Sequence, residues 1–430
     1  MASIKKRPNG KWRARYRDAD KHEHSRHFDR KTDAQRWLDE VTTSIVTGQY
    51  VHPKAGDITF HEYAETWRTI ASHRKSTADL VQRHFTNHVY PAIGQKRLKN
   101  ITPSDIRTLD KALGEKLAPS TVVVIHRYVS AVLASAVRDR KIATSPTVTV
   151  TAPKPGKKKV VPLSTEVVFS LRDVIPERYR ALVVTTAGTG LRQGEVFGLT
   201  LDRVDLVRRT MTVDRQLVSV NGSRPAFGDL KTEASEREVP LPQTVVDALT
   251  THLATYSTGA DGLIFTNSEG GALRRSAFND VWTAARRTVL AAFAWLDASL
   301  EDRVGSVAKT LGTSTAKAGA LVVQARAAGL VPPDDASPTL IESARAALGD
   351  LPRGAMVFHD LRHYYASLLI RRGASVKVVQ ARLGHKSAAE TLDTYSHLWP
   401  DDDDRTRDAV DSVLGAVPAD SLRTAHPVAA

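Results

Sequence analysis

The stretch FHDLRHYYASLLIRRG, residues 358 to 373, places two histidines and an arginine at the start of an apolar helix. His359, Arg362 and His363 lie within two turns of one another, because an α-helix completes a turn every ~3.6 residues. Such a group suits a metal site, a clamp for a phosphate group, or simply a basic helix start. Residues elsewhere in the chain distinguish these three interpretations.

A metal site is the weakest interpretation. His359 and His363 have the spacing of the HExxH zinc pattern, but Asp360 stands where that pattern has its glutamate. Arg362 would lie beside the cation, and neither cysteines nor a carboxylate-rich cluster offers further ligands. We therefore expect neither a metal nor another cofactor.

A phosphate clamp gains support from two other segments. Arginine binds phosphate oxygens through two parallel hydrogen bonds and stays charged at neutral pH. TGLRQGE, residues 189–195, supplies a second arginine, Arg192, and LGHKSAAETLDTYSHLW, residues 383–399, adds His385 and Tyr395. A tyrosine phenol, with a pKa of about 10, is a poor nucleophile unless nearby cations favour the phenolate. Two arginines would be such cations.

Five short motifs follow one another along the chain: TGLRQGE, the lysine in DLKTEASEREVPL (residues 229–241), HDLRH, LGH and TYSH. Together they resemble the tyrosine recombinase family, the phage-type integrases. The resemblance spans the whole chain and includes the basic N-terminal sheet of integrases that bind accessory arm sites. Each motif alone is a weak signal, whereas five in this order are specific.

The resemblance implies a catalytic role for six residues. Tyr395 would attack a DNA phosphate and form a 3′-phosphotyrosyl link. Arg192 and Arg362 would hold the non-bridging oxygens, and His385 would bond to the same phosphate. The other two roles concern protons: Lys231 would protonate the leaving 5′-oxygen, and His359 would assist proton transfer at Tyr395.

Two neighbouring residues receive lesser roles. His363 has no catalytic role across the family, so we expect it to be structural, and we expect Glu195 to orient its neighbours. The reaction would need neither metal nor ATP, because the phosphotyrosyl ester conserves the energy of the broken bond.

The composition agrees with a DNA-binding protein. The 430 residues include 61 Lys and Arg against 47 Asp and Glu, a formal net charge of +14, which makes nucleic acid the first partner to consider. No run of about 18 apolar residues suggests a membrane span, and the N-terminus lacks the apolar core of a signal peptide. With no cysteine in the chain, we expect a cytoplasmic protein of a bacterial host, with no membrane partner.

Residues 1–56 are predicted to form an arm-site DNA-binding domain, a small three-stranded sheet with one helix. KWRARYR alternates in polarity, so one face of a strand carries the arginines Arg13, Arg15 and Arg17. This face suits contact with DNA, although a merely solvated basic sheet would have the same pattern. Thr32 and Gln35 are expected to form a capping box for the helix.

Apolar residues three and four apart predict an all-helical core-binding domain over residues 57–150. Thr102 is its clearest N-cap, because Pro103 follows at the first helical position. A basic linker, residues 151–160, comes next and either follows a DNA backbone or only keeps the chain soluble. Its candidate DNA-contacting residues are Lys157, Lys158 and Lys159.

Residues 161–415 are predicted to form a mixed α/β catalytic domain, with strands in TMTVDRQLV, REVPL and LIFTNS. Compared with the family, the chain carries a helical insertion at residues 291–350. Part of it has the rhythm of a helix-turn-helix, with Gly312 and Thr313 at the turn, as do many alanine-rich helix pairs. Residues 416–430 are expected to be a flexible tail. The predicted fold class is multidomain and mainly α with α+β parts.

These observations predict a site-specific recombinase that integrates or excises a mobile element. Its partners would be double-stranded DNA attachment sites of core and arm types, three further copies of itself in a homotetramer, and accessory DNA-bending or directionality proteins. The C-terminal apolar stripe, which includes Val410 and Val413, would pack on a neighbouring protomer or on its own domain. The alternatives are a non-cleaving DNA-binding regulator of the same fold and a relaxing enzyme of the type IB topoisomerase kind.

Overall fold

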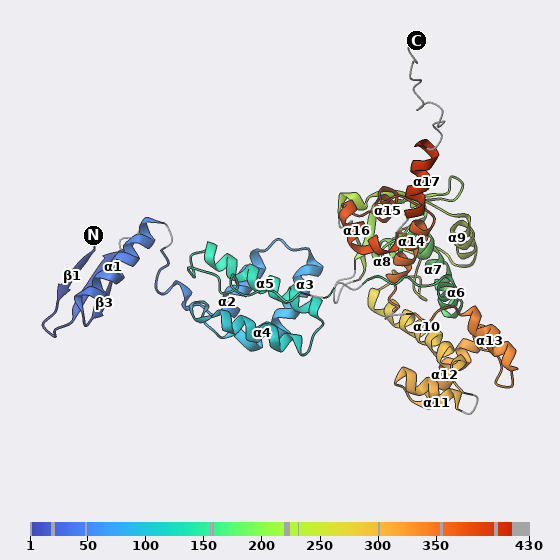
Figure 1. Cartoon of the computed structure of the whole chain (residues 1–430), viewed down its shortest axis with the longest axis horizontal. Coiled ribbons are helices and arrows are strands. Elements are labelled where there is room, and N and C mark those ends of the chain that lie inside the picture. The colour runs from blue at the N-terminus through green and yellow to red at the C-terminus, as the bar shows by residue number, and fades with distance from the viewer. Residues whose placement is uncertain are drawn as a thin grey trace, which may run out of the picture. The chain divides into compact units, whose positions relative to one another are not determined.

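The computed structural model describes residues 2–18, 22–47, 50–154, 156, 159–218, 224–230, 232–299, 302–352, 356–399 and 403–414. The chain divides into two compact units, Met1–Lys157 and Lys158–Ala430, and Figure 1 labels most of their helices. Three of the predicted functional lysines, Lys157, Lys158 and Lys231, lie outside the described residues.

The N-terminal domain is a three-stranded antiparallel sheet covered by one helix, as predicted. Its elements are β1 (Ser3–Lys6), β2 (Trp12–Arg17), β3 (Glu23–Phe28) and α1 (Lys31–Val46). Ala14 and Tyr16 of the central strand are buried against Ala34 and Leu38 of the helix. Because side chains alternate along a strand, the three arginines of β2 lie on the other face.

The predicted capping box of α1 is wrong. The helix begins at Lys31 with Arg30 as its N-cap, so Thr32 already lies inside the first turn. The amide of Gln35 instead donates to the carboxylate of Asp39 at 2.9 Å. The burial of Ala34 and Leu38 under the sheet stabilises this helix without a side-chain cap.

A helical bundle follows, as the periodicity predicts. Its elements are η1 (Ala55–Asp57), α2 (Phe60–Ile70), α3 (Lys75–His84), η2 (Phe85–Gly94), η3 (Leu98–Asn100), α4 (Pro103–Gly114) and α5 (Pro119–Arg138). The Thr102 hydroxyl accepts a hydrogen bond from the backbone of Asp105, whose carboxylate accepts one from the backbone of Thr102. This capping box confirms the predicted start of α4.

Helix α5 is long and apolar enough to cross a membrane by length and composition alone. It serves here as the central helix of the bundle, because Val122, Ile125 and Val129 are buried in its core. In its middle, the imidazole of His126 is hydrogen bonded to Asp110 at 2.8 Å. The features of α5 are therefore those of a core helix.

The second unit packs helices around short antiparallel strands. The elements before the insertion are α6 (Thr165–Val174), η4 (Glu177–Tyr179), α7 (Arg180–Thr189), α8 (Gln193–Phe197), η5 (Leu201–Arg203), β4 (Val204–Asp205), β5 (Thr210–Val213), β6 (Arg215–Val218), β7 (Ala226–Asp229), η6 (Glu233–Ser235), β8 (Arg237–Pro240), α9 (Gln243–Thr255), η7 (Ala260–Gly262) and α10 (Arg275–Leu296). Those after it are α14 (Asp360–Arg371), α15 (Val376–Leu383), α16 (Ala388–Tyr395), η8 (Ser396–Leu398) and α17 (Asp403–Leu414). One sheet has the order β4-β5-β8, and β6 pairs with β7. Helix α7 packs against α6, α9 and α14, so it joins the first and last parts of the unit.

The predicted strands are confirmed in part. TMTVDRQLV forms β5 and β6, interrupted at Asp214, and REVPL contains β8. LIFTNS is not a strand: Leu263 and Thr266 each form a single bridge, to Thr200 and Ala272. Its apolar residues are buried in the core, and burial rather than strand pairing accounts for the apolar run.

Three helices fill the predicted insertion: α11 (Arg303–Leu311), α12 (Thr315–Ala327) and α13 (Pro338–Ala347). Helix α10 continues to Leu296, so residues 291–296 belong to the helix that precedes the insertion. At the other end, the indole nitrogen of Trp282 in α10 donates to the carbonyl oxygen of Met356 at 2.7 Å. This bond anchors the segment that leads into HDLRH to the body of the catalytic domain.

Candidate active site

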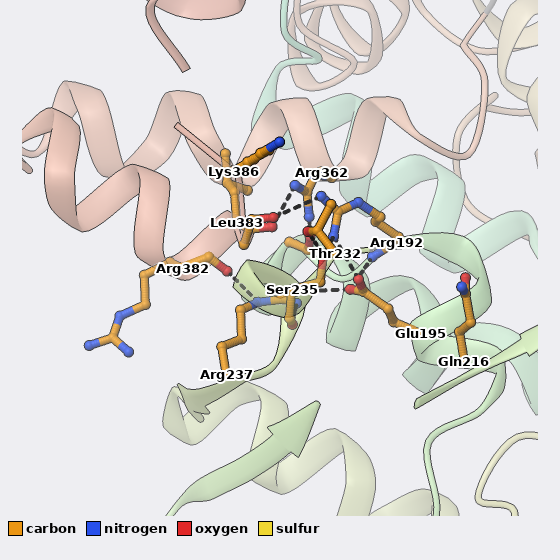
Figure 2. Close-up of polar contacts among 12 residues, drawn as sticks. Arg192, Glu195, Gln216, Thr232, Ser235, Arg237, Arg362, Arg382, Leu383 and Lys386 are labelled. Atoms are coloured by element: carbon orange, nitrogen blue, oxygen red, sulfur yellow. Dashed lines mark hydrogen bonds and ion pairs between the residues drawn. The ribbon is translucent and has the colours of Figure 1, made fainter. Parts of the chain in front are cut away.

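Two arginines from distant parts of the chain meet at one turn of backbone. Arg362 is 2% exposed, and its terminal nitrogens donate to the carbonyl oxygens of Gly190 at 2.7 Å and Leu383 at 2.6 Å. Arg192 donates to the next carbonyl along the chain, that of Gly384, at 3.0 Å. The Leu-Gly pair of LGH therefore holds both guanidinium groups beside each other (Figure 2).

The glycines of these motifs are required by the geometry. Gly190 ends α7 in the left-handed region with φ 66°, and a Cβ there would lie 2.4 Å from the Tyr365 ring. Gly384 ends α15 with φ 62°. The left-handed conformation at both positions favours glycine, and the carbonyls of both residues hold the arginines.

Glu195 orients the arginines, as predicted. Its carboxylate accepts hydrogen bonds from the Arg192 side chain at 2.8 Å, from the Arg192 backbone at 2.9 Å and from Arg237 at 2.8 Å. Burial raises the pKa of Glu195, but Arg237 and Arg192 outweigh burial and hold the pKa at about 2. Glu195 is therefore ionised at neutral pH and holds the guanidinium groups of Arg192 and Arg237.

Arg237 is a site residue that none of the five short motifs predicts. It bonds to Glu195, and its Nε donates to the carbonyl oxygen of Arg382 at 2.9 Å. It lies at the start of REVPL, a segment noted only as a strand. Three arginines against one carboxylate leave the site with an excess of positive charge (Figure 2), which suits an anionic phosphodiester.

Tyr395 ends α16 and is buried, with 1% of its surface exposed. Its hydroxyl shares a hydrogen bond of 2.8 Å with Nδ1 of His363. Burial raises the pKa of Tyr395 to about 12, against the opposing effect of Arg362 and Arg192. In this state the tyrosine is a neutral phenol held by a histidine.

Three histidines surround the tyrosine. The His385 ring lies nearly parallel to that of Tyr395, with the centroids 6.4 Å apart, and its Nδ1 bonds to the Thr391 hydroxyl at 2.8 Å. The His359 ring contacts His363 edge-on at 4.9 Å. Burial is the main cause that lowers the pKa of all three imidazoles to about 4, so all are neutral at pH 7.

The position of His363 differs from its expected structural role. His363, rather than His359, makes the direct hydrogen bond to Tyr395. The His359 ring contacts the His363 ring. In the sequence, only the second histidine of HDLRH indicates this partner of Tyr395. Whether that histidine reaches the tyrosine depends on where α16 packs, which the sequence does not reveal.

The neighbours of Lys231 lie at the site, although Lys231 itself is outside the described residues. Thr232 bonds to Ser235 at 2.9 Å, and the Ser235 hydroxyl accepts a hydrogen bond from Arg192 at 3.3 Å. The segment that follows β7 therefore runs beside the first arginine.

The predicted DNA-contacting residues belong to other parts of the chain. On β2, Arg13 and Arg15 form ion pairs with Glu23 at 3.0 and 3.5 Å, and Arg17 is exposed. Lys159 is exposed in a segment without regular secondary structure.

A possible metal-ligand group lies elsewhere, in the N-terminal domain. Ligand atoms of Asp18, His24 and His52 come within 4.8 Å of one another. The Asp18–His24 hydrogen bond of 2.8 Å and the contact between the two histidine rings at 4.9 Å explain this group without an ion.

The arrangement can hold and polarise a phosphodiester. Each terminal nitrogen of a guanidinium carries two hydrogens, and Arg362 uses one from each for backbone carbonyls. One hydrogen on each nitrogen remains for an oxygen of the substrate. Donors fixed before the substrate arrives are the ones that stabilise the charge on the oxygens of a phosphate group as it reacts.

Comparison with known proteins identifies relatives of both units. The phage integrase N-terminal domain family matches residues 2–47, and the phage integrase family matches residues 171–292 and 335–401. The integrase of Mycobacterium phage L5 is 28% identical over 264 residues, which is 58% of this chain and 70% of that protein. A XerC-like tyrosine recombinase of Caldanaerobacter subterraneus is 23% identical over 402 residues, 86% of each chain.

Solved structures share the fold. The Tn1549 transposon integrase in complex with transposon right end DNA has a TM-score of 0.60 and 16% identity, and the match covers 84% of this chain and 100% of that one. A lambda integrase dimer bound to a core site has a TM-score of 0.50 and 15% identity over 92% of this chain. With more than half of its residues matched by the two family descriptions, the chain belongs to the phage integrase family of tyrosine recombinases.

Proposed function

We infer that the protein is a site-specific DNA recombinase that cuts and rejoins strands through a 3′-phosphotyrosyl intermediate. The observation that carries this inference is the buried Tyr395, which is hydrogen bonded to His363. Two fixed arginines, Arg362 and Arg192, act to lower the pKa of this tyrosine against the effect of burial. A DNA-binding regulator that does not cleave would have no need to keep such a tyrosine in place.

We propose the following roles in cleavage. Arg192 and Arg362 bind the non-bridging oxygens of the scissile phosphate with their remaining N–H groups, and His385, oriented by Thr391, donates to the same phosphate. The oxygen of Tyr395 attacks phosphorus, the bond from phosphorus to the 5′-oxygen breaks, and Lys231 supplies a proton to that oxygen. The free 5′-hydroxyl of a partner strand reverses these steps.

The phenol proton must leave Tyr395 as it attacks. His363 is neutral and its Nδ1 is 2.8 Å from the phenol oxygen, so it can accept this proton directly. His359 contacts the His363 ring and is the second candidate. A phosphate bound to the arginines brings negative charge that stabilises the resulting imidazolium.

The same proposal extends to the assembly on DNA. The N-terminal sheet binds arm sites through the arginines of β2, and the helical and catalytic domains bind core sites. Helix α17 presents Val410, Val413 and Leu414, which are 49%, 70% and 67% exposed. This stripe suits packing on a neighbouring protomer, as in a homotetramer on DNA, with accessory DNA-bending or directionality proteins setting the direction of the reaction in a bacterial cytoplasm.

The test is a labelled duplex that carries the attachment site and a nick just beyond the expected cleavage position, so that a short fragment escapes and the covalent complex accumulates. We expect wild type to give a covalent protein–DNA band on a denaturing gel with EDTA present, and Tyr395→Phe to give none. Tyr364→Phe is the matched control, because Tyr364 lies on α14 and bonds only to the Thr165 hydroxyl at 3.1 Å among the hydrogen bonds found for it in the described residues.

Each contrary result favours a specific alternative. A band that persists in Tyr395→Phe excludes this tyrosine as the nucleophile. Wild-type binding without a band favours the non-cleaving regulator. Relaxation of a supercoiled plasmid that lacks the attachment site favours a topoisomerase-like enzyme.

A further inference from the structure

The insertion contains a helix pair with a very short connection. Helix α11 ends at Leu311, Gly312 takes the left-handed conformation with φ 58° and ψ 46°, and Ser314 caps α12 by accepting from the backbone of Lys317. Only residues 312–314 separate the two helices. A turn of three residues that contains glycine is typical of the helix-turn-helix.

A third helix holds the pair in place. Both α11 and α12 pack on α10, where Trp295 is fully buried and the Arg303 guanidinium lies 4.0 Å from its ring centroid. The Thr288 hydroxyl of α10 donates to Gln324 of α12 at 3.0 Å. Helix α12 buries Ala318, Val322 and Ala325, so its opposite face stays open.

The open face of α12 has small side chains and no acidic residue. The exposed residues of α12 are Thr315, Ala316, Lys317, Ala320, Val323, Gln324 and Ala327, and of these Gln324 also reaches back to α10. Residues 303–331 contain four cationic residues and no Asp or Glu. Two of these, Lys309 and Lys317, are exposed, whereas Arg326 pairs with Asp334 at 2.6 Å.

These features fit a duplex better than a protein surface. A helix with its side chains is about 10–12 Å wide and enters a major groove about 12 Å wide. Short side chains let the helix approach base edges closely, and Lys317 in its first turn reaches a phosphate. The family match omits residues 293–334, so this pair lies outside the part of the catalytic domain that the family shares.

We propose that α11 and α12 form a helix-turn-helix that places α12 in the major groove of duplex DNA, as a contact additional to those of the catalytic and N-terminal domains. This contact would widen the stretch of DNA that each protomer covers. It needs no part of the cleavage chemistry, so it stands independently of the roles assigned to Tyr395 and its neighbours.

The chain has no cysteine, so a single introduced thiol can carry a DNA-cleaving iron chelate. We would label full-length Ala316→Cys, on the open face of α12, and bind it to an end-labelled fragment that carries the attachment site and its flanks. The matched control is Ser343→Cys on α13, which is also exposed. We expect Ala316→Cys to cut both strands at one major-groove segment, and Ser343→Cys not to cut there.

A second variant tests the contact energetically. Lys317→Ala should lower the slope of log affinity against log salt by about 1 on the same fragment, with unchanged covalent trapping on a duplex limited to the core site. The proposal is overturned if labelled Ala316→Cys leaves the DNA uncut, if both labelled variants cut equally, or if unlabelled Ala316→Cys forms a disulfide with a second copy of itself on the DNA.

Discussion

The arginines of the active site and those of the N-terminal sheet have the same side chain in opposite surroundings. Arg362 is buried and fixed by two backbone carbonyls, whereas the side chains of Arg13 and Arg15 are 30% and 40% exposed and share the carboxylate of Glu23. A buried guanidinium acts through its exact position, since its partners cannot rearrange. An exposed guanidinium acts mainly through its charge, which salt screens.

The two regions also differ in how much their charged groups destabilise the fold. Removing charged groups from water is unfavourable, and for Arg192 and Arg362 the active site offsets this through Glu195, three carbonyls and the Ser235 hydroxyl. The sheet arginines remain partly hydrated and need few partners. We therefore expect substitutions in the active site to change both stability and cleavage, and those in the sheet to change affinity alone.

Arg362→Lys is the substitution with the largest expected effect, and it tests whether position or charge matters in the active site. A lysine keeps the charge but cannot donate to both Gly190 and Leu383 from a planar group and still bind a phosphate. We expect cleavage to fall about 1000-fold and the free energy of unfolding to fall by about 1 to 3 kcal/mol, because a buried carbonyl loses its partner. Trapping on the nicked duplex and urea denaturation measure the two effects.

Arg371→Lys is the control for this change, since Arg371 is exposed at the end of the same helix. It should leave both quantities within error. If Arg362→Lys cleaved as fast as wild type, position would matter no more than charge, and the contrast with the sheet would fail.

The three buried histidines of the active site should make the stability of the protein depend on pH. With the folded pKa of His359, His363 and His385 lowered to about 4, the unfolded chain binds protons below about pH 6.5 while the folded chain does not. Stability is therefore complete above pH 6.5 and is lost as the pH falls towards 4, by up to about 1.4 kcal/mol per pH unit for each histidine. Urea midpoints across this range measure the slope.

His363→Gln should reduce that slope by the contribution of one proton, and it should slow cleavage about 100-fold through loss of the acceptor beside Tyr395. Tyr364→Phe, on the same helix, removes no imidazole and serves as the control. An unchanged slope in His363→Gln would mean that this ring is not a buried neutral histidine.

The contrast between the regions also explains what the sequence predicts well. The β2 alternation and the Thr102 cap are local patterns, and both are confirmed. The short motifs lead to Arg192, Arg362 and Tyr395 because five of them follow one another in the order of the family they resemble. The prediction fails where the deciding contact is distant: His363 and Tyr395 are 32 residues apart, and Arg237 and Arg382 are 145 apart. No local pattern reveals such pairs.

The failures near local patterns have a related cause. Thr32 and Gln35 have the residue types and spacing of a capping box, but packing of α1 on the sheet makes the helix begin before them. LIFTNS has the composition of a strand, but its apolar residues are buried in the core without strand pairing. In both segments tertiary packing overrides a local preference.

The smallest effect is expected in the sheet. Replacing Arg13, Arg15 and Arg17 together by alanine should leave the N-terminal fold intact, because the buried face of β2 is unchanged. We expect affinity for arm-site DNA to fall about tenfold at moderate salt, and the slope of log affinity against log salt to fall by about 3, since each lost phosphate contact contributes about 0.9. Core-site cleavage should stay within about twofold of wild type. The control removes equal charge from α1 and its N-cap through Arg30, Lys31 and Arg36, all exposed. If that variant lost as much affinity, net charge rather than the arginine face of β2 would bind the arm site, and the sheet would be no more than a solvated basic surface.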